Sequence, residues 1–328
     1  MIRPFRLSDL FLIYRLQRQG VWLDPRHALI GYEPSAWAAL SAPLRWWSGG
    51  SATYVSKVAG GGIIQMRPRP GRPEVDIVLL APTLEGNEEI AALWRRLLFH
   101  CVQQAGEWQV QRLFVSVLED AEETLSLFRQ VGFVPYTREE AYCLEQSTGI
   151  AVAPKSHQVR PLTSVDSWAL QKLHAAVTPR RVQQAEGGGA SRAGAPPLTW
   201  WAPGRWERMA LVQEGEIAGL VLVEAGWSGH CLRLWGDFHE DTEVLALLER
   251  GLAALAAYPR RPVYCLIREY QSGVRAPLAE HGFHPAATWS CLVKHTVVRV
   301  REPVRRVWPA LEARPEPSVP GAVPSGME

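Results

Sequence analysis

Two glutamates lie at the ends of apolar runs: Glu224 closes one run and Glu269 follows another. Glu74 lies at the start of a third run, where an exposed strand start also tolerates a glutamate. A carboxylate in that position can face a cleft between strands, where burial raises its pKa and favours proton transfer near neutral pH. A solvated strand end is the simpler interpretation of each, because charged side chains are ordinarily exposed.

The histidines of the C-terminal part do not form a metal-binding pattern. None is spaced from a cysteine or an aspartate as zinc ligands are, so we predict no metal site. The sequence also lacks a Walker loop and a recognisable Ser/His/Asp order. The histidines concerned are His230, His239, His281, His284 and His295.

The cysteines point to a reducing compartment. There are five, an odd number, with no C-x-x-C, and Cys143 and Cys291 lie in apolar runs. Buried free thiols are typical of this pattern. Arg3, Arg6 and Asp9 interrupt the apolar residues near the start, and no run reaches the ~18 apolar residues of a membrane span. We therefore expect a cytoplasmic protein without a membrane partner.

Length and charge set further bounds. With 328 residues, the chain is long enough for two domains with full cores. Its net charge of +2 gives no general attraction for polyanions, so we expect no nucleic-acid partner.

Three short motifs occur twice in the same order: an Arg-Pro pair, a Gly-Phe-x-Pro and a Cys-Leu pair. A repeat of about 150 residues has the size of a whole domain rather than of a solenoid unit. The sequence therefore predicts two copies of one fold. The first copy contains Arg3-Pro4, Gly132-Phe133-Val134-Pro135 and Cys143-Leu144, and the second contains Arg160-Pro161, Gly282-Phe283-His284-Pro285 and Cys291-Leu292.

Each copy shows the same succession of expected elements. A strand and a helix come first, then a meander of three strands, an amphipathic helix, a strand, a helix that stops at the Gly-Phe, and a final strand. The two amphipathic helices carry apolar residues at matching offsets, and this pairs Ile90 with Val244. We expect a first domain over 1–148, a linker over 149–156 and a second domain over 157–300. A disordered Pro-rich tail should occupy 301–328.

The order of elements and the Gly-Phe after the penultimate helix resemble the GNAT (GCN5-related N-acetyltransferase) superfamily. The resemblance covers both copies and implies an α/β fold with a mixed sheet in two tandem GNAT-like domains. In that family, the loop after the fourth strand has the pattern Q/R-x-x-G-x-G/A and holds the pyrophosphate of acetyl-CoA. The resemblance assigns acetyl-CoA to the backbone of Leu79 and Leu80 and to Gly86 and Asn87, and the general base to Glu74.

The same loops depart from the family pattern. In the register set by the helices, Glu85, Glu88 and Ile90 replace the Gln/Arg, the glycine and the Gly/Ala. A shift of two residues makes Gly86 the glycine but places Thr83 and Glu88 at the other positions. Acidic residues crowd the phosphate position in either register. They are also ordinary first-turn acids, which the helix dipole favours.

The second copy departs further. Its loop, from His239 to Val244, contains no glycine, although Gly236 lies just before it. The tyrosine that often protonates the leaving thiolate in this family is replaced by Phe128 in the first copy and Leu278 in the second.

Two functions remain open from the sequence. The first is an N-acetyltransferase that transfers an acyl group from acyl-CoA to a small amine. The second is a non-catalytic tandem GNAT-like protein that binds a ligand or a partner through the inherited cleft.

A long loop over 178–205 carries Trp200 and Trp201, which pack onto the protein itself or form a flap over an acceptor pocket.

Overall fold

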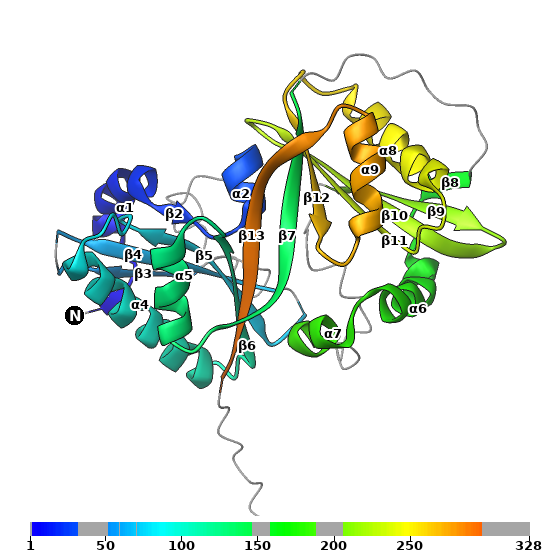
Figure 1. The fold of residues 1–328 in the computed structure, drawn as a ribbon. Helices are drawn as coiled ribbons and strands as arrows, with labels where there is room; N and C mark the ends of the chain where they lie inside the picture. Colours follow the sequence, from blue (N-terminus) through cyan, green and yellow to red (C-terminus); the bar gives the residue numbers. More distant parts are fainter. Residues whose placement is uncertain are drawn as a thin grey trace, which may run out of the picture. The chain divides into compact units, whose positions relative to one another are not determined.

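The computed structural model describes residues 2–31, 52–58, 60–69, 71–145, 158–187 and 206–296. Within these ranges, thirteen strands form one mixed sheet, and twelve of them follow the order β1-β3-β4-β5-β6-β13-β7-β12-β11-β10-β9-β8 (Figure 1). The predicted linker and the predicted tail lie outside the described residues. The described part of the chain belongs to one compact unit.

The first copy begins with β1 and ends with β7. Its helix α4 follows the predicted amphipathic pattern, α5 ends before Gly132 as predicted, and both pack apolar side chains against the core of this copy. The bounds are β1 (Ile2–Pro4), α1 (Leu10–Leu16), β2 (Val21–Trp22), α2 (Pro25–Ile30), β3 (Ala52–Ser56), β4 (Gly62–Pro68), β5 (Glu74–Ala81), α4 (Glu88–Glu107), β6 (Arg112–Leu118), α5 (Glu122–Gln130) and β7 (Val134–Leu144).

The second copy repeats this order, and α8 takes the place of α4. The segment expected as one loop from 178 to 205 instead contains a helix, α7, and residues 188–205 lie outside the described part. The bounds are β8 (Gln158–Pro161), α6 (Ser167–Val177), α7 (Arg180–Glu186), β9 (Trp206–Gln213), β10 (Glu216–Ala225), β11 (His230–Gly236), α8 (Asp241–Leu255), β12 (Val263–Arg268), α9 (Arg275–Glu280) and β13 (His284–His295).

Local features confirm the repeat. The Arg3 guanidinium forms an ion pair with the Asp9 carboxylate at 2.6 Å, and Arg160 pairs with Asp166 at 2.7 Å after the same interval of six residues. After α5 and α9, Gly132 and Gly282 have φ values of +93° and +79°. Glycine takes this left-handed conformation without steric cost, which explains the repeated Gly-Phe.

The last strands of the two copies are exchanged. β7 of the first copy pairs with β12 of the second, whereas β13 of the second copy pairs with β6 of the first. β7 and β13 also pair with each other, antiparallel, along most of their length. Figure 1 shows these two strands side by side between the two groups of helices. Each copy therefore depends on the other to complete its sheet.

Candidate functional site

The strands β5 and β6 separate after a short parallel pairing. Only residues 74–76 of β5 pair with 112–114 of β6. Opposite Gln65 and Met66 of β4, the register of β5 shifts by one residue at Val78, which forms a β-bulge. A bulge bends a strand and changes the direction in which its edge runs.

The chain itself fills this opening in the first copy. β2 pairs antiparallel with β5, placing Val21 opposite Leu80 and Trp22 opposite Leu79. The Leu23 N–H then donates to the Val78 carbonyl at 2.9 Å. On the other side, the Ser116 N–H of β6 donates to the Leu23 carbonyl at 3.2 Å. The edge of β5 assigned to acetyl-CoA by the resemblance is therefore paired with protein backbone.

In the first copy, side chains of the protein cap the loop that the resemblance assigns to the pyrophosphate. The Asn87 side chain accepts hydrogen bonds from the N–H groups of Glu89 and Ile90, at 2.9 and 3.3 Å. The Gly86 N–H donates to a carboxylate oxygen of Glu123 at 3.2 Å. These are the donors that would otherwise hold an anion at a helix N-terminus.

The corresponding loop of the second copy is capped by Glu243. This buried carboxylate accepts hydrogen bonds from the Gln213 side chain at 2.6 Å and from the His239 N–H at 2.9 Å. Burial acts to raise the pKa of Glu243, but these hydrogen bonds and one from the Glu240 N–H lower it below its usual range. A carboxylate of the protein thus accepts from the loop that the resemblance assigns to the pyrophosphate.

Glu74 lies in a buried ion-pair cluster rather than at a solvated strand end. Its side chain is 1% exposed and pairs with three arginines, Arg69 at 3.4 Å, Arg72 at 2.9 Å and Arg112 at 3.0 Å. Phe128 and Leu278, at the tyrosine positions, are fully buried in the cores of their copies. Within the described part of the chain, Glu74 does not line a pocket together with Leu79, Leu80, Gly86 or Asn87, the other residues predicted for the site.

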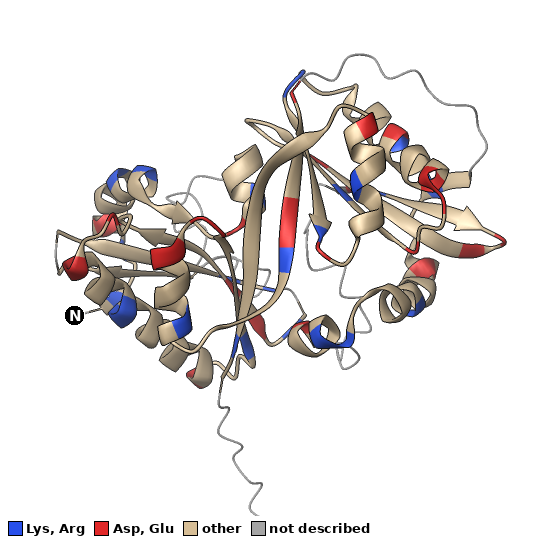
Figure 2. Cartoon of the chain, viewed as in Figure 1, with Lys and Arg blue, Asp and Glu red and all other residues tan. Residues whose placement is uncertain are grey.

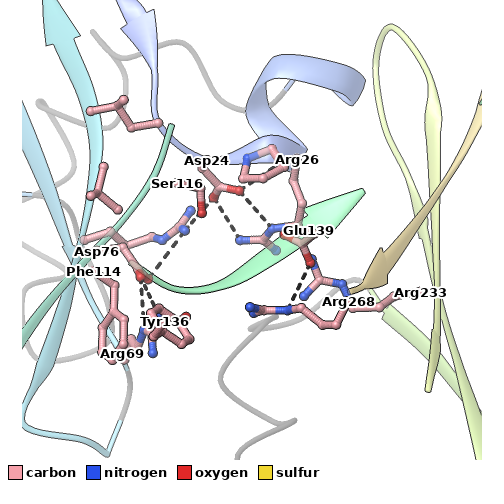
Figure 3. A pocket seen from close by; sticks show the side chains of 14 residues that line it. Asp24, Arg26, Arg69, Asp76, Phe114, Ser116, Tyr136, Glu139, Arg233 and Arg268 are labelled. Carbon is pink, nitrogen blue, oxygen red and sulfur yellow. Dashed lines mark hydrogen bonds and ion pairs between the residues drawn. The ribbon is translucent and has the colours of Figure 1, made fainter. Parts of the chain in front are cut away.

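A cavity of about 60 Å³ lies where the two copies meet. Side chains enter it from α2, from the sheet of the first copy and from β7, β11 and β12 (Figure 3). Charged and polar groups dominate its wall. They include Asp24, Arg26, Arg67, Arg69, Asp76, Ser116, Tyr136, Glu139, Arg233 and Arg268.

Ion pairs order the first-copy side of this cavity. Asp24 caps α2 by accepting a hydrogen bond from the Arg26 N–H, and it pairs with the Arg67 guanidinium at 2.6 Å. Burial alone would raise the pKa of Asp24, but the charges of Arg26 and Arg67 hold it well below its usual range. The Arg69 guanidinium pairs with Asp76 at 2.7 Å and stacks over the Phe114 ring at 3.7 Å.

The second-copy side is tied to the exchanged strand β7. Glu139 of β7 pairs with Arg233 of β11 at 2.6 Å and with Arg268 of β12 at 3.5 Å. Arg268 also donates to Glu186 at the end of α7, at 3.2 Å. Figure 2 shows acidic residues next to a basic one midway along β7, corresponding to Arg138, Glu139 and Glu140. The strand exchange therefore carries a buried charge into the second copy.

Glu224 and Glu269 have different surroundings. Glu224 is 2% exposed and lies 3.8 Å from Arg26, so the expectation of a solvated strand end is wrong for this residue. Burial, with a smaller contribution from Asp24, raises the pKa of Glu224. Glu269 is partly exposed and forms an ion pair with Arg181.

The charged lining of the cavity was not predicted from the sequence. One pattern in the sequence pointed to it: Arg233 interrupts the otherwise apolar run from Cys231 to Trp235. Charged residues are rarely fully buried unless they are paired. Arginines at such positions were therefore candidates for an internal ion-pair network.

Several predictions concern thiols, metals and membranes. All five cysteines are free and buried, as predicted. Among the described residues, no group of three or more His, Cys, Asp or Glu side chains is arranged to hold a metal ion. No helix within the described ranges is both long and apolar enough to cross a membrane.

Solved structures share the fold at low sequence identity. A GCN5-related N-acetyltransferase from Sphaerobacter thermophilus matches with a TM-score of 0.54 and 16% identity, covering 90% of this chain and 95% of that chain. A tandem GNAT protein from the clavulanic acid biosynthesis pathway, solved without acetyl-CoA, matches with a TM-score of 0.55 and 14% identity over 90% and 98%. A Drosophila protein matches with a TM-score of 0.51 and 12% identity over 90% and 98%.

Comparisons by sequence add no family assignment. No protein-family model matches the chain, and a search of curated proteins finds no match. The structural matches span almost the full length of their partners, and the element order and repeated motifs agree with them. The protein has the α/β fold of the tandem GNAT proteins.

Proposed function

We propose that this protein is a non-catalytic tandem GNAT-like binding protein whose first copy does not take an acyl-CoA in the inherited cleft. The observation that carries the proposal is the backbone of Val21–Leu23, which pairs with β5 and bonds to β6. An extended ligand arm cannot form the same hydrogen bonds, because each of these backbone groups already has a partner.

The residues present do not fit acetyl-CoA in either phosphate loop. In the first copy, Glu123 and Asn87 accept from the loop N–H groups. In the second copy, Glu243 does so. A nearby like charge costs a bound phosphate on the order of 1 kcal/mol at partly exposed distances. We therefore derive no acyl-transfer step for this chain.

A second candidate is an N-acetyltransferase whose active site lies in the second copy. One observation favours it. The parallel pairing of β11 with β12 ends at Arg233 and Leu266, and among the described residues no strand lies between β11 and β12 beyond that point. A small amine would then be the acceptor. The capped loop before α8 opposes this candidate, because it leaves Glu243 where a phosphate would have to lie.

Calorimetry of the full chain with acetyl-CoA and with CoA tests the proposal. We expect no saturable heat up to about 1 mM of either compound. Saturable binding followed by loss of the thioester in the presence of an amine would overturn it and establish the second candidate. The five buried free thiols fit a reducing compartment, so a cytoplasmic location is part of the same proposal.

A further inference from the structure

The first helical segment of the first copy, residues 7–19, presents a row of apolar side chains to solvent. The opposite side of this segment carries Ile13 and Leu16, which are buried against the sheet. The exposed row follows the spacing i, i+3, i+4, i+7, so its members lie on one face of the helix. A contiguous apolar row of this kind marks an interaction surface, whereas scattered exposed residues do not. Its members are Leu7, Leu10, Phe11 and Tyr14, with exposed fractions of 74%, 37%, 79% and 52%.

The second copy shows that the fold does not require this apolar face. The ion pairs Arg3–Asp9 and Arg160–Asp166 set the offset between the copies at 157 positions, since 160 − 3 and 166 − 9 both give 157. At that offset, only Phe11 keeps an aromatic counterpart, which is Trp168. The other three positions are polar in the second copy, so the apolar face belongs to the first copy alone. They are Ser164, Ser167 and Gln171, in the places of Leu7, Leu10 and Tyr14.

Basic residues border the apolar face. The one carboxylate between residues 2 and 23 is that of Asp9, which is 2% exposed and forms an ion pair with Arg3. Figure 2 shows the basic residues of this segment. The surface is therefore apolar and positively charged. Its exposed basic residues are Arg6, Arg15 and Arg18 on the segment and Lys57 on the turn that follows β3.

Two of these cations are held at the edge of the apolar face. The Arg18 guanidinium lies 5.3 Å from the centre of the Tyr14 ring and donates to the Tyr14 hydroxyl at 3.2 Å. Arg15 donates to the Gly60 carbonyl, in the turn between β3 and β4, at 2.9 Å. The face ends at Gln19, whose carbonyl accepts from the Thr83 N–H at 2.7 Å. The segment therefore carries an apolar strip with a cationic border.

This chemistry fits the surface of a membrane that contains anionic lipids. Leucine and aromatic side chains enter the boundary between headgroups and acyl chains, while Lys and Arg stay at the level of the anionic headgroups. Side chains that protrude as far as Phe11 fit a soft interface that closes around them, which favours lipid over a folded protein partner. A second copy of the chain is disfavoured, because a two-fold interface would bring the same cations together.

We propose that the exposed face of residues 7–19 docks the protein on an anionic lipid surface. The apolar row enters the headgroup boundary, and the bordering arginines bind the lipid phosphates. The expectation of no membrane partner rested on the lack of a membrane-spanning run, which a helix lying on the surface does not need. The proposal goes beyond the proposed function and does not depend on it, because neither copy has to bind an acyl-CoA for docking.

Co-sedimentation of the full chain with lipid vesicles tests the proposal. One set of vesicles is pure phosphatidylcholine, and the other contains about 30% phosphatidylglycerol. We expect binding to the anionic vesicles, much weaker binding to the neutral ones, and loss of binding as NaCl rises from about 50 to about 300 mM. No binding to the anionic vesicles, or equal binding to both kinds, would overturn the proposal.

Matched variants of the two copies keep the test specific. Phe11→Ser should weaken vesicle binding about tenfold or more, because it removes the most exposed apolar side chain of the row. Trp168→Ser removes the exposed aromatic at the matched position of the second copy and should leave binding unchanged. Equal binding by these two variants would overturn the assignment to the first copy.

A triple variant gives the first copy the polar residues that the second copy already has. Leu7→Ser, Leu10→Ser and Tyr14→Gln together should abolish co-sedimentation, while circular dichroism shows the fold retained. If the triple variant does not fold, the comparison of Phe11→Ser with Trp168→Ser decides the matter.

Size-exclusion chromatography separates lipid from a second copy as the occupant. A concentration-dependent dimer that Phe11→Ser abolishes, without vesicle binding by the wild type, would overturn lipid docking in favour of self-association. Turnover of acetyl-CoA would overturn only the proposed function, whereas the absence of vesicle binding would overturn only this inference.

Discussion

The backbone carbonyl of Leu23 accepts a hydrogen bond from the N–H of Ser116 at 3.2 Å. The Leu23 N–H donates in turn to Val78 on the neighbouring strand β5. A single residue thus joins the two strands that part after residue 76. The contact closes the opening of the first copy with backbone hydrogen bonds and a buried side chain, which is 2% exposed.

Leu23→Ala should lower the free energy of unfolding by about 2–5 kcal/mol, because it leaves a cavity in the core of the first copy. Urea unfolding followed by circular dichroism measures this loss. The matched control is Leu7→Ala, since Leu7 is 74% exposed and should change stability by no more than about 0.5 kcal/mol. Similar small effects for both variants would contradict a packed Leu23.

Glu243→Ala should destabilise the second copy by about 1–2 kcal/mol, because the N–H groups before α8 lose their acceptor. The folded-state pKa of Glu243 is lowered, so its contribution is present above the ordinary value of 4.5 and is lost as pH falls through the folded pKa. Thermal unfolding from pH 7 to pH 3 should show the two proteins converging in acid. Asp241→Asn, an exposed change at the same helix end, is the control.

Glu74→Gln should lower the free energy of unfolding by about 3–5 kcal/mol, because it leaves the buried Arg69 and the partly buried Arg72 and Arg112 without their shared carboxylate. Chemical denaturation measures the loss. Glu119→Gln breaks a largely exposed pair with Arg138 and should cost no more than about 1 kcal/mol. A folded, fully stable Glu74→Gln protein would contradict the structural role and revive Glu74 as a candidate base.

Glu224→Gln should raise the Tm at pH 7 to 8. Burial raises the folded-state pKa of Glu224, so folding favours its neutral form. The stability that this residue contributes is fully present below 4.5 and is lost as pH rises through the folded pKa, at about 1.4 kcal/mol for each pKa unit. Glutamine stays neutral, so the advantage of the variant should disappear below pH 4.5. A Glu224→Gln protein that is less stable than the wild type at pH 8 would contradict this prediction. It would show that the ion pair between Arg26 and ionised Glu224 stabilises the fold.

Local patterns in the sequence predicted much of the fold. The apolar periodicity of α4 and α8 and the Gly-Phe turns after α5 and α9 depend on neighbouring residues alone. These features are therefore readable from one chain. The helix α7 was missed because its seven residues stand beside a Gly-rich stretch that indicates a loop.

The candidate site was harder to predict than the helices and turns, because residues far apart in the sequence come together to form it. The exchange of β7 and β13 depends on how two similar strand edges compete for partners, and hydrophobic periodicity carries no information about that choice. The insertion of Leu23 between β5 and β6 joins residues far apart in the chain. The cavity brings Asp24 and Arg233 to one wall for the same reason.

Backbone hydrogen exchange tests the central claim most directly. The N–H groups of Leu23 and Ser116, with that of Thr83, which donates to Gln19 at 2.7 Å, report on the filled opening. We predict that all three exchange about a thousandfold or more slowly than unstructured backbone and that acetyl-CoA at about 1 mM leaves their rates unchanged. Exchange of Leu23 and Ser116 at the rate of unstructured backbone, with protection appearing on addition of acetyl-CoA, would contradict the account.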